Sequence, residues 1–309
     1  MAKQIFKSSE HQALFDRQGF IVLPFLNAQE LQHLNAYFDE VHPHLVEDGF
    51  VSGSYSADFA YKKKASDEIV AVFERAYEQY FENYTPFGGA FLYKTPGKHS
   101  ALAAHQDWTI VDEQTDVALN CWVPLCDITP ENGPIMILPG SQFSKHPVLR
   151  APTLPFFFSG HDELVLQELE PMLVPAGTAV ILNQSVIHYS PSNTSQKIRK
   201  AITAGLKSAG AQMRFHYKVP GQDQLEVFEQ QDDFLIRFDN FISDIGQRPK
   251  IGTSVGQIPY VLPQYDKEEL RSLIAQLKTA AGYPLRSTVT STSEPAQHSF
   301  LQRLKRLFK

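Results

Sequence analysis

The chain has 309 residues, 43% of them hydrophobic, and a formal net charge of −6. This length is ample for one large core, and the negative charge argues against a nucleic-acid-binding protein, which normally carries a basic stripe. The two cysteines, Cys121 and Cys126, are too few and too close together for a disulfide framework. No run approaches the about 18 apolar residues of a membrane span, and residues 1–10 lack the apolar region of a signal peptide, so we expect a cytoplasmic protein.

Helix signals dominate the first part of the chain. Asn27, with Glu30 three residues later, forms a capping-box pattern in front of a helix expected over residues 28–41. A second amphipathic helix is expected over residues 67–82. Each has one apolar stripe, so we assign the N-terminal helices, within residues 9–83, to the outer face of a sheet.

A β-rich region follows the helices. Residues 89–219 contain short alternating or apolar segments separated by Pro, Gly and Asn turns. The expected fold class is mainly β with flanking helices, built on a double-stranded β-helix core, that is, a cupin-like jelly roll. Helix signals return at residues 223–241 and 267–281, so a C-terminal helical segment over residues 223–281 would complete a single domain of residues 1–285.

The end of the chain has a different composition. Residues 286–299 are rich in Ser and Thr and are typical of a linker. Residues 300–309 combine apolar side chains on one helical face with four basic residues elsewhere. Such a tail can make weak contact with an anionic membrane surface or a partner, or it can dock on its own domain or be disordered.

Three side chains in the β-rich region, His105, Asp107 and His188, have the chemistry of a metal site. Residues i and i+2 of a strand point to the same side, so His105 and Asp107 can reach one ion. Two neutral imidazoles and one carboxylate can occupy one face of an octahedral Fe(II) and leave the opposite face open. Singly these residues carry little weight, because a His-x-Asp triplet arises by chance in roughly every second chain of this composition.

An arginine after the second histidine strengthens this interpretation. A turn rich in Pro, Ser and Asn separates strands expected over residues 186–190 and 199–206. If these strands form a hairpin, His188 lies opposite Arg199, and directly opposed residues share a face. Ser190 would point the same way, and small residues alternate along the Arg199 strand, which leaves volume for a bound molecule.

From Phe15 to about Lys218 the sequence resembles the phytanoyl-CoA dioxygenase family of Fe(II)- and 2-oxoglutarate-dependent oxygenases. The most specific part of the resemblance is His188 followed at fixed offsets by Ser, Asn, Ser and Arg199. The segments that carry the resemblance are residues 15–24, 105–108, 118–125, 131–141 and 188–195.

The resemblance implies roles for individual residues. His105, Asp107 and His188 would be the iron ligands, and Arg199 with Ser190 would hold the distal carboxylate of 2-oxoglutarate. The reaction would use O2 to hydroxylate an unactivated C–H bond and release succinate and CO2. Related halogenases carry a small residue in place of the carboxylate, so Asp107 argues for hydroxylation, or for desaturation or ring closure.

Further side chains are weaker candidates for the same site. Trp122 and Asn120 share one face of an expected strand and are predicted to line the co-substrate pocket, although Trp122 could equally be a core residue. Tyr93 and Lys94 lie on the strand before the His-x-Asp triplet, where family members often contact the co-substrate or substrate. They point to opposite faces, so at most one is expected to serve.

Two other segments bear on the substrate. Arg214 and His216 share a face of an expected strand and could receive an anionic substrate, with a solvent-facing stripe as the alternative. The loop over residues 48–64 lies where such folds often carry a lid, or is a solvated connection.

Two alternative functions remain open. One is a cupin-like metalloenzyme that uses the same metal ligands without 2-oxoglutarate, for which Arg199 would have no purpose. The other is a non-catalytic binding protein of the same fold. The partner is expected to be a small-molecule or lipid/acyl substrate and not a nucleic acid, and neither its identity nor the oligomeric state follows from the sequence.

Overall fold

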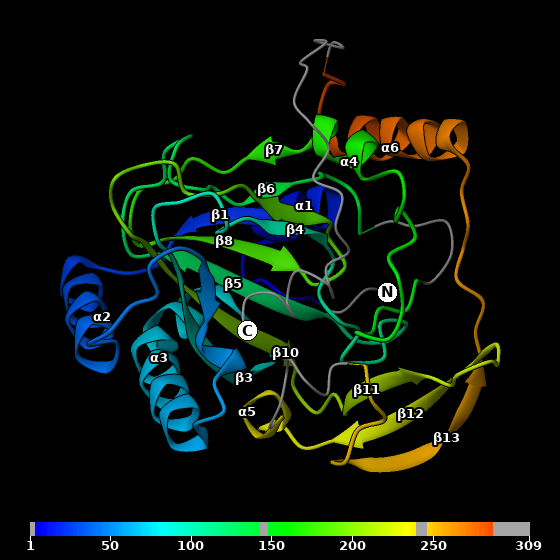
Figure 1. Cartoon of the computed structure of the whole chain (residues 1–309), viewed down its shortest axis with the longest axis horizontal. Helices are drawn as coiled ribbons and strands as arrows, with labels where there is room; N and C mark the ends of the chain where they lie inside the picture. The colour runs from blue at the N-terminus through cyan, green and yellow to red at the C-terminus, as the bar shows by residue number, and fades with distance from the viewer. Residues whose placement is uncertain (1–3, 143–147, 239–245, 287–309) are drawn as a thin grey trace.

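Antiparallel sheets form the core of the computed structural model, which describes residues 4–142, 148–238 and 246–286 (Figure 1). A six-stranded and a four-stranded sheet make the two layers of the core, and the apolar side chains of Trp122, Val180 and Ile137 pack between them. In spatial order, the first sheet holds β1 (Phe20–Pro24), β8 (Thr178–Asn183), β5 (Ala118–Pro124), β10 (Arg199–Ser208), β3 (Tyr84–Lys94) and β2 (Phe50–Ser52). The second holds β4 (Leu102–His105), β9 (His188–Ser190), β6 (Met136–Ile137) and β7 (Glu170–Pro171). The predicted jelly-roll core is confirmed.

A third sheet lies beside this core (Figure 1). It holds β11 (Met213–Lys218), β12 (Gln224–Gln230) and β13 (Thr253–Pro259). The prediction of helix over residues 223–241 was therefore wrong for most of its length, since only α5 (Phe234–Arg237) is helical there within the described residues. Phe228 of the strand and Phe234 of the helix pack in one buried cluster.

Helices cover the outer face of the six-stranded sheet, as predicted (Figure 1). They are α1 (Ser9–Gln18), α2 (Ala28–Val41) and α3 (Phe59–Tyr80), and a short helical turn, η1 (Gly53–Tyr55), precedes α3. The expected bounds of α2 are confirmed, because Asn27 and Glu30 form the predicted capping box. The N-terminal region is not purely helical, since it also contributes β1 and β2 to the sheet.

Two further helices lie against the four-stranded sheet (Figure 1). They are α4 (Asp162–Glu168) and α6 (Lys267–Ala281), and α6 has the bounds predicted for it. Asp266 caps its start and Gly282, with φ of 82°, ends it, which are strong local signals. No helix among the described residues is long and apolar enough to cross a bilayer. The predicted tail, residues 300–309, and nearly all of the linker lie outside the described part of the chain.

Candidate metal centre and its cavity

Pairing between two short strands brings the predicted metal ligands together. In the antiparallel pair of β4 and β9, His105 lies directly opposite His188, and their ring centroids are 4.1 Å apart. Asp107 lies just beyond the end of β4, and its Oδ1 atom is 3.9 Å from Nε2 of each histidine. One ligand atom from each of the three residues lies within 4.8 Å of the others. The side chains therefore converge as a group that can hold one ion.

The hydrogen bonds of the two imidazoles orient them for metal binding. Nδ1 of His105 lies 2.8 Å from the main-chain oxygen of Ala103, and Nδ1 of His188 lies 3.0 Å from that of Val186. A carbonyl oxygen can only accept, so each Nδ1 carries a hydrogen, and each Nε2 is left on the side that faces Asp107. Burial, and then the neighbouring His188, lower the pKa of His105 to about 4, so its ring is neutral near pH 7.

The carboxylate of Asp107 is held by a short hydrogen-bonded chain. Nδ2 of Asn120 donates to Oδ2 of Asp107 over 3.0 Å, and Oγ1 of Thr203 donates to Oδ1 of Asn120 over 2.6 Å. The other oxygen of Asp107 is thereby turned toward the histidines. Asn120, predicted as a wall of the co-substrate pocket, lies in the cavity lining, and its amide also holds the predicted metal ligand.

Arg150, which the sequence alone did not single out, holds the main chain of Asp107. Nε of Arg150 donates to the main-chain oxygen of Asp107 over 2.7 Å, and its other nitrogens pair with both carboxylate oxygens of Glu113. The side chain of Arg150 is only 3% exposed, so these contacts are sheltered from water. Gln106 adds a third restraint by donating to the main-chain oxygen of Ser185.

Arg199 has the environment of an anion-binding residue. It is 2% exposed, and its Nε and Nη1 atoms have no hydrogen-bond partner among the described residues. Its guanidinium lies over the ring of Trp122 at 5.5 Å, and burial lowers its pKa to about 10. A buried cation with open donors is unfavourable until an anion binds, and a planar guanidinium can donate two parallel hydrogen bonds to a carboxylate.

The predicted hairpin between His188 and Arg199 does not form. Arg199 begins β10 and pairs with Lys94 of β3, whereas His188 pairs with β4 and β6 of the other sheet. The chain between them crosses from one layer to the other, and Asn193 holds that crossover by donating to the main-chain oxygens of Lys94 and Lys197. His188 and Arg199 still line one cavity, because the two layers face each other across it.

This cavity has a volume of about 250 Å³. Its lining includes the three candidate ligands and five of the other residues considered above: Ser190, Arg199, Trp122, Asn120 and Thr203. Ser190 is also buried, and its hydroxyl donates to the main-chain oxygen of Gly133 over 3.0 Å. Part of the predicted lid forms another wall, from Ser52 to Tyr55.

Two predicted contacts from strand β3 are not made at the cavity wall. The ring of Tyr93 packs in the core between the six-stranded sheet and the helices. Lys94 is fully buried, and its Nζ donates to the main-chain oxygens of Ser190 and Pro191 over 2.9 and 2.5 Å. Neither residue is among the described residues that line the cavity, so the structure supports a role for Lys94 in holding the Ser190 strand rather than in contacting a ligand.

Arg214 and His216 of β11, which were expected to receive an anionic substrate, are also not among the described residues that line the cavity. Arg214 pairs with Asp112 at 3.1 Å. His216 is buried, with Nδ1 3.1 Å from the main-chain oxygen of Thr109. Both side chains have partners within the protein and neither is among the described lining residues, so their role in receiving an anionic substrate stays a prediction that this geometry does not support.

Comparison with known protein families shows which family the chain belongs to. The profile of the Phytanoyl-CoA dioxygenase (PhyH) family matches residues 15–201, more than half of the sequence. The chain belongs to the phytanoyl-CoA dioxygenase family. The resemblance identified from the sequence motifs is thus confirmed, and the matched residues include the three candidate ligands and Arg199.

Curated relatives and a solved structure agree with this assignment. Dioxygenase andF of Emericella variicolor is 26% identical over 141 residues, covering 43% of this chain and 45% of that protein. Phytanoyl-CoA dioxygenase domain-containing protein 1 of Danio rerio is 32% identical over 120 residues, covering 37% and 41%. The chain thus spans less than half the length of these relatives. The crystal structure of EvdO2 from Micromonospora carbonacea var. aurantiaca, complexed with 2-oxoglutarate, matches 68% of this chain and 94% of that chain at 18% identity with a TM-score of 0.50, which shows a shared fold.

Proposed function

We propose that the protein is an Fe(II)- and 2-oxoglutarate-dependent dioxygenase that hydroxylates an unactivated C–H bond of a small-molecule or lipid/acyl substrate. One molecule each of 2-oxoglutarate, O2 and substrate would give succinate, CO2 and the hydroxylated product. The proposal rests on the meeting, in one cavity, of the His105, Asp107 and His188 cluster with buried donors of Arg199 that no other described residue pairs.

The donor set fits the two groups that this chemistry requires. Two neutral imidazoles and a carboxylate suit Fe(II) and leave other coordination positions open. When bound, iron and 2-oxoglutarate supply the oxidation of a C–H bond by O2. Arg199, with Ser190 nearby in the same lining, would orient the distal carboxylate of 2-oxoglutarate. The buried ring of Trp122 shields that end of the cavity from water.

The first alternative, a metalloenzyme of the same fold that does not use 2-oxoglutarate, makes no use of Arg199. In that case the open donors at Nε and Nη1 would face the cavity without a ligand. Anaerobic titration of the Fe(II)-loaded protein with 2-oxoglutarate separates the possibilities, because the proposal expects a visible charge-transfer band. A metalloenzyme without this co-substrate, or a non-catalytic protein, would show none.

Activity is tested with purified protein, Fe(II), ascorbate and 2-oxoglutarate, by measuring succinate. We expect succinate release from the wild type and none from His105→Ala, because the cluster loses one of its two imidazoles. His44→Ala, a change at an exposed histidine, serves as the matched control and should retain activity. Equal succinate release from His105→Ala and the wild type would refute the proposal. A substrate library screened for stimulated succinate release would then identify the primary substrate.

A cytoplasmic location and a weak membrane contact through residues 300–309 are further proposals. Both thiols, Cys121 and Cys126, are free, which suits a reducing compartment. Cell fractionation tests the location. Liposome flotation of the full-length protein against a chain truncated at Ser299 tests the tail, and equal flotation would contradict it.

A further inference from the structure

The cavity continues past the metal cluster in the direction away from Arg199. Arg199 and Gly205 both line it and lie on β10, roughly 20 Å apart along an extended strand. Thr203 lies between them on the same strand, and hydrogen bonds join it through Asn120 to Asp107. The metal cluster therefore lies beside Thr203, between the two ends of the cavity. The Arg199 end therefore suits the co-substrate, and the Gly205 end is left for the substrate.

The Gly205 end has apolar walls from three separate parts of the chain. Phe87 comes from β3, Ile110 from the segment after the metal ligands, and Leu235 and Ile236 from α5. The ring of Phe87 lies against Gly205, since a Cβ atom there would be 2.0 Å from two ring carbons. The ring therefore lies at this end of the cavity, in a position that only glycine at residue 205 permits.

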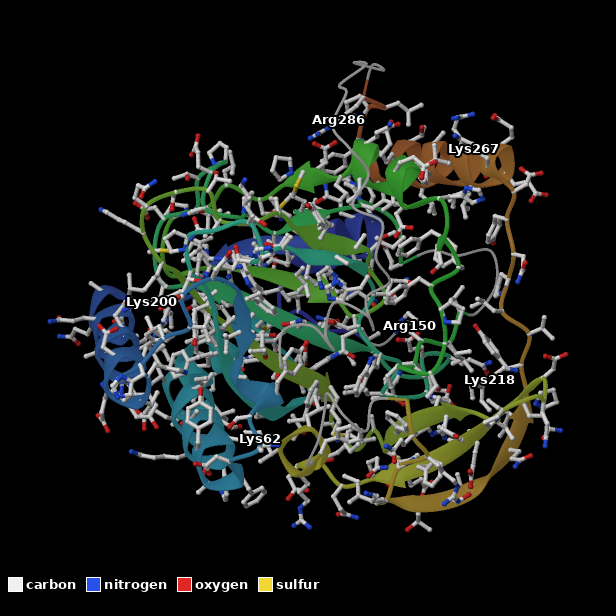
Figure 2. The ribbon with its side chains drawn as sticks, in the orientation of Figure 1. Lys62, Arg150, Lys200, Lys218, Lys267 and Arg286 are labelled. Carbon is white, nitrogen blue, oxygen red and sulfur yellow. The ribbon has the colours of Figure 1, made fainter. Side chains whose placement is uncertain are left out.

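The side chain of Lys62, at this end of the cavity, is hydrogen-bonded within the protein. Lys62 lines the cavity, but it is buried and its Nζ donates to the main-chain oxygen of Phe238 over 3.1 Å. This bond ties α3 to the end of α5 and so supports the wall that Leu235 and Ile236 provide (Figure 2). Among the described lining residues, acidic side chains are limited to Asp107, so a cationic group of a ligand finds no further carboxylate here.

We propose that the Gly205 end of the cavity binds an uncharged hydrocarbon chain or ring of the substrate, and that Phe87 is the end stop that sets its length. The assignment of this part to the substrate rests on the proposed function, whereas binding itself does not require metal. Burial of a methylene group stabilises by about 0.8 kcal/mol, so each one that fits should tighten binding about fourfold. A chain that reaches the ring of Phe87 gains nothing from further length.

The two tryptophans of the chain report on this cavity from opposite ends. Trp122 lies beside Arg199, and Trp108 packs in the apolar cluster that contains Phe87 and Ile110. The variant Trp122→Phe therefore leaves one tryptophan, at the Gly205 end, whose fluorescence can be excited selectively over that of the tyrosines. The experiment titrates this metal-free protein with 1-alkanols of increasing length and follows the fluorescence of Trp108.

We expect the affinity to rise about fourfold per methylene group up to a cutoff and then to level off. In the same background, Phe87→Ala should move the cutoff to chains about two to four carbons longer, the space that a phenyl ring occupies. Ile236 is a half-buried residue of the wall, and Ile236→Phe should move the cutoff to shorter chains. This second variant tests the inference even if Phe87→Ala does not fold. Phe73→Ala is the matched control, because it removes a fully buried ring outside the described lining of the cavity.

An affinity that is independent of chain length, or a cutoff that is the same in all variants, would overturn the inference. Loss of the proposed function would look different. In that case succinate release would be absent while the length dependence of alkanol binding remained.

Discussion

Nε of Arg150, a residue labelled in Figure 2, donates a 2.7 Å hydrogen bond to the main-chain oxygen of Asp107, so a residue outside the predicted metal ligands holds one of them in place. We predict that Arg150→Met weakens binding of Ni(II), used as a redox-stable probe, by about tenfold, the lower end of the range for residues that support ligands. Isothermal titration calorimetry measures this. Arg214→Met, which breaks an ion pair with Asp112 away from the cavity lining, is the control, and equal losses in both variants would contradict the role of Arg150.

The chain from Thr203 through Asn120 to Asp107 gives a graded prediction. Asn120→Ala frees the carboxylate and should weaken Ni(II) binding about tenfold, whereas Thr203→Val only frees the amide of Asn120 and should cost less. Because Thr203 acts through Asn120, the double variant should bind Ni(II) as Asn120→Ala does. Additive losses in this double-mutant cycle, measured by the same titration, would show that Thr203 acts by another route.

Arg199 should affect the co-substrate and the stability of the free protein in opposite directions. Hydrogen bonds to charged groups contribute about 1.5–3 kcal/mol, so Arg199→Met should weaken 2-oxoglutarate binding about 10- to 150-fold and leave Ni(II) affinity unchanged. Without 2-oxoglutarate the same variant should have a higher Tm, because the wild type buries a cation whose Nε and Nη1 find no hydrogen-bond partner in the described part of the chain. A lower Tm would mean that the wild-type guanidinium is already satisfied.

Protonation of a buried histidine away from the cavity should destabilise the protein in mild acid. Burial lowers the pKa of His216 from 6.5 to about 4, so the unfolded chain takes up a proton between these values and the folded chain does not. The stabilisation is complete above pH 6.5 and is lost as the pH falls toward 4. His216→Asn should therefore remove about 2 kcal/mol of the fall in unfolding free energy between pH 7 and pH 5. Urea titrations at both pH values measure it, with exposed His44→Asn as a control that keeps the wild-type slope.

Local signals were enough to predict much of the secondary structure. The helix over residues 28–41 has the expected bounds because its capping residues and apolar spacing all lie within the segment. The alternation around Trp122 correctly separated a face toward the cavity from a face toward the helices, since that period of two belongs to a single strand. The helix expected over residues 223–241 failed because β12 is stabilised by partners on both sides, β11 and β13, which no local pattern reveals.

The sequence by itself determined the family, the jelly-roll class and the chemical identity of the candidate site, because the motif residues have their chemistry wherever the chain places them. Only the tertiary structure decided how they meet. His188 and Arg199 approach across two sheets rather than along one hairpin, and Arg150 reaches Asp107 from a loop. Strand partners and buried polar contacts join positions far apart in the chain, so their selection depends on how the whole core packs.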